Sequence, residues 1–277
     1  MTDPRLTPCN GRVAAERLRG AVAAARFRVG EPATIAAPLA DLRRSAGGAR
    51  DRQLLRGDRV QVYERRSGWA FLEAGRDGYC GYVEEAALEP VVEATHRVIA
   101  RATHVYPAPD PKREEQALLS FGSFLRVEGA AGLFFEVAGG GFVPRVHLRP
   151  VNAPLADPAM AAQILLGTPY LWGGNSAFGI DCSGLVQAAC LACNIPCPGD
   201  SDLQAAVLGT ELAADTPLRR GDVVFWDGHV GMMLGEAMLI HANATAMAVA
   251  CEPLGKVVAR IASDEGRPVT RRRRLSA

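Results

Sequence analysis

The stretch Gly179-Ile180-Asp181-Cys182-Ser183-Gly184-Leu185 stands directly before an apolar run with helical character. Two histidines follow in strand-like surroundings, His229 in Asp227-Gly228-His229-Val230-Gly231 and His241 in Leu239-Ile240-His241-Ala242-Asn243. A hydrolase with a thiol nucleophile needs a thiolate, an imidazole that takes the thiol proton, and a polar group that orients the imidazole. A helix N-terminus and a nearby imidazole both lower the pKa of a thiol. The pattern therefore predicts a thiol hydrolase whose reacting groups come from Cys182, His229 and His241.

Composition limits the classes of partner that we expect. The chain has 277 residues, 48% of them hydrophobic and 22% charged, with a net charge of +1. Near-neutral charge argues against nucleic acid or an anionic membrane surface as the main partner. No apolar run reaches the roughly 18 residues of a membrane-spanning helix. The first ten residues lack the apolar core of a secretory signal, so we expect a cytoplasmic protein; seven cysteines, an odd number, fit a reducing compartment.

The region from about residue 30 to 150 reads as β-structure. Apolar and polar residues alternate in Arg59–Glu64 and Gly68–Glu73, and glycines separate short strands at regular spacing. The segment 81–90 also aligns without gaps on 141–150. Two tandem barrels, 31–92 and 93–151, explain this repeat after an N-terminal arm over 1–30. One long β-domain with chance similarity remains the alternative.

A proline-rich linker over 151–158 separates the β-region from a C-terminal region in which helical patterns come first. Helices are expected over 159–166, 185–193 and 202–207, and a short helix within the arm at 13–19. Strands are expected over 222–226, 230–234 and 237–241 as an antiparallel meander. Helices followed by such a meander predict an α+β domain over 152–277.

Four motifs in this last region resemble the NlpC family of papain-like cysteine peptidases, which cleave bacterial cell-wall peptides. The motifs occur in family order and the resemblance spans about residues 154–265. They are Thr168-Pro169-Tyr170-Leu171-Trp172-Gly173-Gly174, Asp181-Cys182-Ser183-Gly184-Leu185, Arg220–Trp226 with His229-Val230-Gly231, and Ile240-His241-Ala242. The resemblance implies an α+β papain-like catalytic domain, with Cys182 as nucleophile, His229 as general base and His241 as the polar group that orients the base imidazole.

The resemblance also implies roles for three residues around Cys182. Tyr170 lines the site and supplies an O–H donor to the developing oxyanion, alongside a backbone N–H at the helix start. Asp181 and Ser183 help to bind a free α-amine of the substrate, because a carboxylate pairs with an ammonium. A helix N-cap is the structural alternative for Asp181, and both roles are compatible. A core position is the alternative for Tyr170.

The tandem β-blocks resemble bacterial SH3-like domains, which often accompany this catalytic domain. In cytosolic relatives the barrel beside the site offers an acidic residue and a tyrosine to the substrate amine. Asp51 and Tyr79 match these positions best, although the family residue is often Glu and the register is open. A turn aspartate and a barrel-core tyrosine are equally good interpretations.

No cofactor or metal is expected. Cys190, Cys193 and Cys197 begin like a zinc knuckle, but no second ligand pair stands nearby and the first two fall inside the apolar helix. The histidines outside the catalytic region (His96, His104 and His147) have no nucleophile near them in the sequence. The run Arg271–Arg274 fits a charged end of the last strand better than a nucleic-acid patch.

We therefore expect a cysteine peptidase that hydrolyses the bond between γ-D-Glu and an L-diamino acid, such as meso-diaminopimelate, in murein tripeptides or tetrapeptides with a free N-terminal L-Ala. The absence of a signal sequence favours peptide recycling. Two alternatives remain: an amidase or acyltransferase on the same thiol scaffold, and a peptidoglycan-binding module without activity. Nothing in the sequence sets the oligomeric state.

Overall fold

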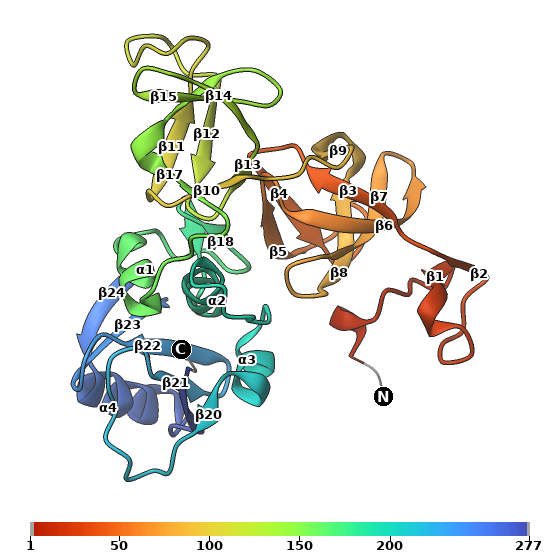
Figure 1. Cartoon of the computed structure of the whole chain (residues 1–277). Helices are drawn as coiled ribbons and strands as arrows, with labels where there is room; N and C mark the ends of the chain where they lie inside the picture. The colour runs from red at the N-terminus through yellow and green to blue at the C-terminus, as the bar shows by residue number, and fades with distance from the viewer. Residues whose placement is uncertain (1–2, 276–277) are drawn as a thin grey trace. The chain divides into compact units, whose positions relative to one another are not determined.

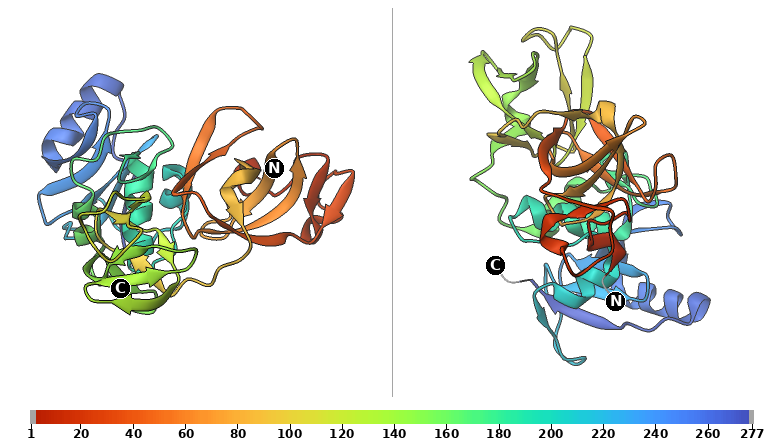
Figure 2. Two further views of the ribbon diagram at one scale, coloured as in Figure 1. Left: turned by 90° about the horizontal axis from the view of Figure 1, so that it is seen from above. Right: turned by 90° about the vertical axis from the view of Figure 1, so that its right-hand side faces the viewer.

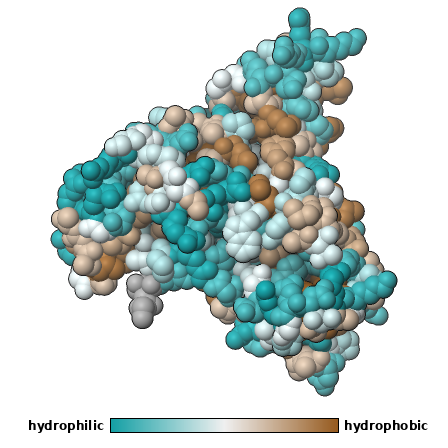
Figure 3. All heavy atoms as spheres, turned by 180° about the vertical axis from the view of Figure 1, so that it is seen from behind, coloured by the Kyte–Doolittle hydropathy of each residue, from teal (hydrophilic) through white to brown (hydrophobic). Residues whose placement is uncertain are grey.

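The computed structural model describes residues 3–275 and divides into two compact units, Met1–Ala153 and Pro154–Ala277 (Figure 1). Each unit has hydrophobic clusters of its own. On the face drawn in Figure 3, hydrophilic residues predominate and apolar residues occur in small groups. Within residues 3–275 no helix is long and apolar enough to cross a membrane.

The first β-module of the N-terminal unit is one antiparallel sheet. Among the described residues its strands run in the order β5-β4-β8-β7-β6-β3-β9. The alternation read from the sequence sets their faces, since Val60 and Val62 of β6 are buried while Arg59 and Gln61 are exposed. The strands are β3 (Glu31–Ile35), β4 (Leu39–Arg43), β5 (Arg50–Leu55), β6 (Arg59–Arg66), β7 (Trp69–Ala74), β8 (Cys80–Glu84) and β9 (Leu88–Glu89), with a 3₁₀ turn η3 at Glu85–Ala87.

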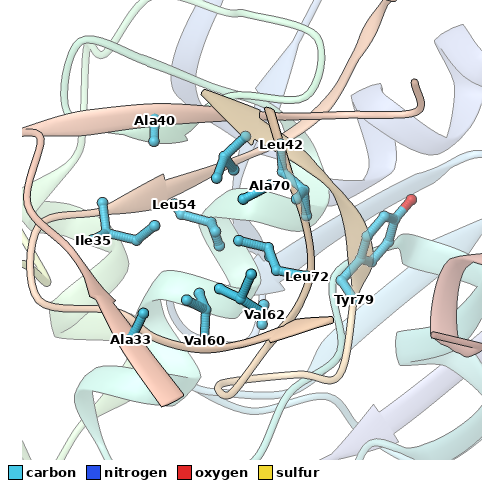
Figure 4. Packing of buried hydrophobic residues seen from close by; sticks show 12 residues of the cluster. Ala33, Ile35, Ala40, Leu42, Leu54, Val60, Val62, Ala70, Leu72 and Tyr79 are labelled. Carbon is cyan, nitrogen blue, oxygen red and sulfur yellow. The ribbon is translucent and has the colours of Figure 1, made fainter. Parts of the chain in front are cut away.

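Small aliphatic side chains fill the inside of this module (Figure 4). Ile35, Leu42, Leu54 and Leu72 are among its fully buried members. Tyr79 lies at the edge of the cluster, with its hydroxyl pointing away from the aliphatic side chains. The module therefore has a closed core of the kind that a small barrel needs.

The N-terminal arm contradicts one expectation, because residues 13–19 do not form an α-helix. Val13–Ala15 is a strand, β1, that pairs in parallel with β2 (Arg26–Arg28), and a 3₁₀ turn, η2 (Glu16–Leu18), follows it. Val13 and Ala15 pack against Tyr63 and Phe71. Residues two apart share one side of a strand, so this packing favours extended backbone. Another 3₁₀ turn, η1 (Pro4–Leu6), precedes β1.

The second β-module repeats part of the first. Segment 81–90 forms strand, 3₁₀ turn and strand, and the aligned segment 141–150 does the same. Its core includes Val98, Leu119 and Val143. Its elements are β10 (His96–Val98), β11 (Ala102–Val105), β12 (Ala117–Ser120), β13 (Phe124–Leu125), β14 (Val127–Ala131), β15 (Phe134–Val137), β16 (Phe142–Pro144), η4 (Arg145–His147) and β17 (Leu148–Pro150). Within the described chain they pair as β13-β10-β17, β11-β12 and β14-β15-β16.

The C-terminal unit is built on an antiparallel sheet with the strand order β20-β25-β21-β22-β23-β24 over its described residues. The expected meander is present as β21, β22 and β23. The four arginines at 271–274 form β25, which lies between β20 and β21 rather than at the end of the meander. The strands are β20 (Thr210–Glu211), β21 (Val223–Trp226), β22 (His229–Met233), β23 (Met238–Asn243), β24 (Ala248–Pro253) and β25 (Arg271–Arg274), with a separate pair β18 (Asn175–Ser176) and β19 (Gly179–Ile180).

The helices expected in this unit correspond to α1 (Pro158–Ile164), α2 (Cys182–Ala192) and α3 (Ser201–Val207), the last with Asp200 at its N-cap. A further helix, α4 (Leu254–Glu265), was not predicted. Its Val257 and Ile261 pack against Val224, Met233 and Leu239 of the sheet. Figures 1 and 2 show α4 on the outside of the C-terminal unit.

Candidate active site

Cys182 is the first residue of α2, and Asp181 is the N-cap of this helix. Oδ1 of Asp181 accepts hydrogen bonds from Gly184 N at 2.6 Å and from Ser183 Oγ at 3.0 Å. Its Oδ2 accepts one from Gly173 N at 2.9 Å. The aspartate thus caps the helix and ties its first turn to the preceding glycine-rich loop, which fixes where Cys182 stands.

The glycine-rich loop has to approach this first turn very closely. A Cβ on Gly184 would lie 2.5 Å from the carbonyl oxygen of Gly174, and one on Gly174 would lie 2.5 Å from that of Gly179. Gln204 of α3 supports the same turn, because its Nε2 donates to Ser183 O at 2.9 Å. The motif glycines therefore allow the loop and helix to pack backbone to backbone.

The Cys182 side chain is buried, with 7% of the residue exposed. Burial, followed by the negative charge of Asp181, raises the pKa of the Cys182 thiol to about 12. Backbone N–H groups of Val230, Ser183 and Cys182 itself act in the opposite direction. The sequence favoured a thiol pKa lowered by the helix start. The structure gives the opposite direction, because the thiol is desolvated and its neighbour is an anion.

His229 opens β22 directly after a tight turn. Trp226 and His229 are paired across β21 and β22, so Asp227 and Gly228 alone make the connection. Gly228 has φ 70°, a left-handed conformation that favours glycine. Because Val230 N acts on the Cys182 thiol, the start of β22 brings His229 beside the start of α2.

His229 and His241 are hydrogen bonded to each other through their rings. Nε2 of His229 lies 2.8 Å from Nδ1 of His241. This contact occupies Nε2 of His229 and leaves Nδ1 as the ring nitrogen that can take the thiol proton. The two imidazoles thus form a hydrogen-bonded pair, and their roles as base and orienting group stay predictions.

Both members of the thiol–imidazole pair favour their neutral forms. Burial, followed by the charge of His241, lowers the pKa of His229 to about 3. With a thiol pKa of about 12, neither group ionises alone near neutral pH. A proton transfer from Cys182 to His229 would create both charges together, and their mutual attraction would offset part of the desolvation.

A carboxylate that the sequence analysis missed continues this chain of groups. Oε1 of Glu252 lies 2.9 Å from Nε2 of His241, and Arg260 of α4 donates to both oxygens of Glu252, at 2.5 and 2.8 Å. The Arg260 guanidinium lowers the pKa of Glu252 to about 2. His241 itself is fully buried, and this burial lowers its pKa. An acidic residue in the strand after His241 was the available signal, but no motif marked it.

Tyr170 lies close enough to Cys182 for the charge of the thiolate to affect the pKa of its hydroxyl. Burial raises the pKa of the Tyr170 hydroxyl, and the charges of Cys182 and Asp181 raise it further. Backbone hydrogen bonds hold the residue, since its N–H donates to Met247 O at 2.9 Å. The tyrosine is therefore half-buried beside Cys182 rather than in the centre of the core.

Asp51 and Tyr79, the barrel candidates for substrate binding, belong to the N-terminal unit. Asp51 accepts hydrogen bonds from Arg44, at 2.6 and 3.3 Å, and lines an open hollow of about 920 Å³. Tyr79 is only 3% exposed and belongs to the core of the first β-module. This burial favours the core interpretation of Tyr79.

Burial accounts for two further cysteines of the C-terminal unit, and ion pairs account for two of its arginines. Cys190 and Cys197 are buried in the C-terminal unit. Among the residues that the structure describes, no group of His, Cys, Asp and Glu stands in a metal-binding arrangement. Arg274 pairs with Asp222, and Arg271 with Glu211. The arginine run thus makes up a whole strand of the sheet rather than only the end of one.

A helix with cysteine at its N-terminus, beside an antiparallel sheet that carries paired histidines, defines a papain-like α+β fold. Comparison with protein-family models agrees: residues 167–260 match the NlpC/P60 family, and residues 42–88 match the bacterial dipeptidyl-peptidase SH3 domain. The chain contains an NlpC/P60 peptidase domain and a bacterial SH3 domain, which confirms the resemblance predicted from the sequence.

Curated relatives include peptidases. The gamma-D-glutamyl-L-lysine dipeptidyl-peptidase of Bacillus subtilis (strain 168) is 27% identical over 219 residues, which are 71% of this chain and 73% of the relative. Dipeptidyl-peptidase 6 of Lysinibacillus sphaericus is 37% identical over 78 residues, which are 28% of each protein. The chain thus spans only about a quarter of the Lysinibacillus protein.

Solved structures share the fold over most of the chain. A crystal structure of an NlpC/P60 family protein from Bacillus cereus ATCC 10987 aligns with a TM-score of 0.72 at 19% identity. The alignment covers 88% of this chain and 99% of that protein. The similarity therefore extends beyond the peptidase domain to the β-modules before it.

Proposed function

We propose that this protein is a cysteine peptidase that hydrolyses the bond between γ-D-Glu and an L-diamino acid in murein peptides with a free N-terminal L-Ala. The hydrogen-bonded chain that starts at His229 and runs through His241 to Glu252, beside a cysteine at a helix N-terminus, is the observation that carries the proposal. The NlpC/P60 match and the peptidase names of the relatives support the reaction class.

The proposed reaction begins with the thiol. Sγ of Cys182 attacks the carbonyl carbon of the scissile amide while its proton moves to Nδ1 of His229. The negative charge that develops on the carbonyl oxygen is met by the backbone N–H of Cys182 and by the hydroxyl of Tyr170. His229 then gives the proton to the leaving amine, which produces a thioester and the free amine of the diamino acid.

Water completes the cycle by attacking the thioester. Nδ1 of His229 takes a proton from the water, the C–S bond breaks, and the thiol is restored with that proton. Throughout both halves the Nε2 proton of His229 stays on its hydrogen bond to His241. The ring therefore keeps one orientation while its other nitrogen shuttles the proton.

The substrate class is drawn from the relatives and from the charge at the site. The Bacillus subtilis relative bears the name of an enzyme for γ-D-glutamyl-L-lysine. Asp181 next to the nucleophile offers a carboxylate to a substrate ammonium, with Ser183 as the further predicted contact in the same unit. Meso-diaminopimelate is our expected diamino acid, and L-lysine is the comparison substrate.

Domain organisation and location form part of the same proposal. We infer an arm over 1–30, SH3-like barrels over 31–92 and 93–151, and the peptidase domain over 152–277. The repeated strand, 3₁₀ turn and strand in 81–90 and 141–150 supports a second barrel. Recycling of murein peptides in the cytoplasm is the proposed setting.

Mass spectrometry of the reaction products tests the function. Wild-type protein is incubated with L-Ala-γ-D-Glu-meso-diaminopimelate and with the L-lysine peptide, and Cys182→Ala is the matched control. Release of free L-Ala-γ-D-Glu by wild type alone supports the proposal. Transfer of the acyl group to an added amine in place of hydrolysis indicates an acyltransferase. Binding without turnover by any variant indicates a binding module.

A further inference from the structure

Glu252 stands at the end of the hydrogen-bonded chain and has no role in the reaction described above. We propose that Glu252 is a positioning residue that fixes which nitrogen of His241, and through it of His229, carries the proton. It does so in competition with Asn243, which faces the same nitrogen. This inference deepens the proposed function and rests on it.

The strand register brings Glu252 to His241. Leu239 of β23 is paired with Glu252 of β24, and His241 stands two residues after Leu239. Residues two apart share a face of the sheet, so Glu252 and His241 are diagonal neighbours on the face where Leu239 packs against α4. Arg260 of α4 reaches this face and holds the carboxylate from the other side.

An ionised carboxylate can only accept hydrogen bonds. Arg260 lowers the pKa of Glu252 to about 2, so the group is a carboxylate near neutral pH. Its contact with Nε2 of His241, at 2.9 Å, therefore requires a proton on Nε2. Nδ1 of a neutral His241 is then an acceptor, and the 2.8 Å contact with His229 requires a proton on Nε2 of His229. That leaves the Nδ1 lone pair of His229 free to take the thiol proton.

Asn243 favours the opposite arrangement. Its Nδ2 lies 3.1 Å from Nε2 of His241. Ala246 N donates to Oδ1 of Asn243 at 2.8 Å, which fixes the amide with its NH₂ toward the histidine. Nε2 cannot both donate to Glu252 and accept from Asn243. A charged acceptor makes the stronger hydrogen bond, so Glu252 prevails.

Loss of Glu252 should reverse the direction of the hydrogen bonds between Asn243, His241 and His229. Asn243 would then donate to Nε2 of His241, and the proton of that ring would move to Nδ1. Nε2 of His229 would have to accept it, and the proton of His229 would move to Nδ1. A base nitrogen that already carries a proton cannot deprotonate Cys182, so the reaction would slow although no group touching the substrate had changed.

Two measurements on the whole polypeptide test the proposed role of Glu252. Long-range ¹H–¹⁵N spectra of ¹⁵N-histidine-labelled protein report the protonated nitrogen of each ring, and steady-state kinetics report kcat and KM. The variants are Glu252→Ala and the double variant Glu252→Ala/Asn243→Asp, which returns an acceptor to Nε2. Glu211→Ala is the matched control, because it removes an ion-paired glutamate from the same unit away from the site.

Wild type should show both histidines protonated at Nε2. Glu252→Ala should show protonation at Nδ1 and a kcat about 10- to 100-fold lower with little change in KM, by analogy with the larger loss on forcing the wrong tautomer at a catalytic base. The double variant should recover at least about tenfold in kcat. Glu211→Ala should match wild type.

Wild-type histidines protonated at Nδ1 would overturn the proposal without any variant. So would unchanged tautomers in Glu252→Ala, or a loss of kcat that Asn243→Asp does not reduce. The spectra need no substrate. An inactive wild type with both histidines protonated at Nε2 would therefore contradict the proposed function while supporting the role of Glu252.

Discussion

His229 and His241 meet ring to ring, with Nε2 of the first 2.8 Å from Nδ1 of the second. Their centroids are 5.1 Å apart and the rings are inclined by 63°. This contact engages Nε2 of His229 and leaves Nδ1 as the nitrogen that we propose takes the proton of Cys182.

Substitution of the nucleophile should abolish turnover and leave the fold intact. We expect Cys182→Ala and Cys182→Ser to lower kcat by at least about 10⁴-fold, since only the thiolate attacks the carbonyl. Product release from the murein tripeptide measures the rate, and circular dichroism monitors the fold. Cys190→Ala is the matched control. Residual activity of Cys182→Ala within tenfold of wild type would remove Cys182 from the mechanism.

Alkylation of Cys182 should depend on His229. Burial in the fold raises the pKa of the Cys182 thiol to about 12, so it should react near neutral pH only when His229 takes its proton. Iodoacetamide should therefore label Cys182 before the other cysteines in wild type, and much more slowly in His229→Ala. Peptide mass spectrometry measures both rates, with the partly exposed Cys9 as internal control. Equal rates in the two proteins would contradict the pairing.

The two histidines should differ in their response to substitution. His229→Ala should reduce kcat about as much as loss of the thiol, because it removes the nitrogen that is proposed to take the thiol proton. His241→Ala should be milder, about 10²- to 10⁴-fold, and His241→Gln milder still, since an amide oxygen can accept the Nε2 proton of His229. Kinetics of the three variants provide the test. A wild-type rate for His229→Ala would exclude it as the base.

Local motifs were enough to single out Cys182, His229 and His241, since each lies in a short run with a characteristic neighbour, and their catalytic roles stay predictions. Glu252 could not be predicted in the same way. Its position depends on the register of β23 with β24, which pairs it with Leu239. Sequence alternation shows which residues share a strand face, but it does not show which residue of the next strand lies opposite.

Helix α4 is a different case, because its pattern was present in the sequence. Leu254, Val257, Val258 and Ile261 have helical spacing, and Gly266 ends the helix in a left-handed conformation. The direction of the thiol pKa was wrong for another reason. The sequence shows that Cys182 starts a helix, but it does not show that the thiol is desolvated beside Asp181.

Acid should destabilise the folded chain through His229. Its pKa is about 3 in the fold and near 6.5 when exposed, so the unfolded chain binds the proton first as the pH falls. Stability is therefore fully present above pH 6.5 and falls between pH 6.5 and 3, by up to about 1.4 kcal/mol per pH unit for one proton. Glu252 adds a second loss between pH 4.5 and about 2.

Urea unfolding of the full chain at several pH values tests this linkage. His229→Ala should show a shallower fall in the free energy of unfolding between about pH 6.5 and 4.5 than wild type. Val207→Ala, which shortens an exposed and uncharged side chain of the C-terminal unit, is the control and should keep the wild-type slope. Identical slopes for His229→Ala and wild type would mean that His229 titrates normally in the fold.

The carboxylate of Asp181 has one hydrogen-bond acceptor site left, and this site bears on substrate choice. An ionised carboxylate offers about four acceptor sites, and three are filled by Gly184 N, Ser183 Oγ and Gly173 N. The remaining site can accept from an ammonium without breaking the helix cap. The cap role and the predicted amine-binding role of Asp181 are therefore compatible.

A free N-terminal amine should accordingly increase turnover. A hydrogen bond between charged groups contributes about 1.5–3 kcal/mol, so N-acetylated tripeptide should react about 10- to 100-fold more slowly than the free peptide. The loss should fall mainly on kcat/KM. Asp181→Asn keeps a capping side chain but removes the charge, so it should discriminate much less between the two peptides. Competition between free and acetylated peptides, quantified by mass spectrometry, gives the ratio directly for both proteins. Equal kcat/KM for the two peptides in wild type would show that the site does not require the amine. Clearing of whole sacculi would show the same, because L-Ala is amide-linked in them. Either result would favour a role in wall remodelling over one in peptide recycling.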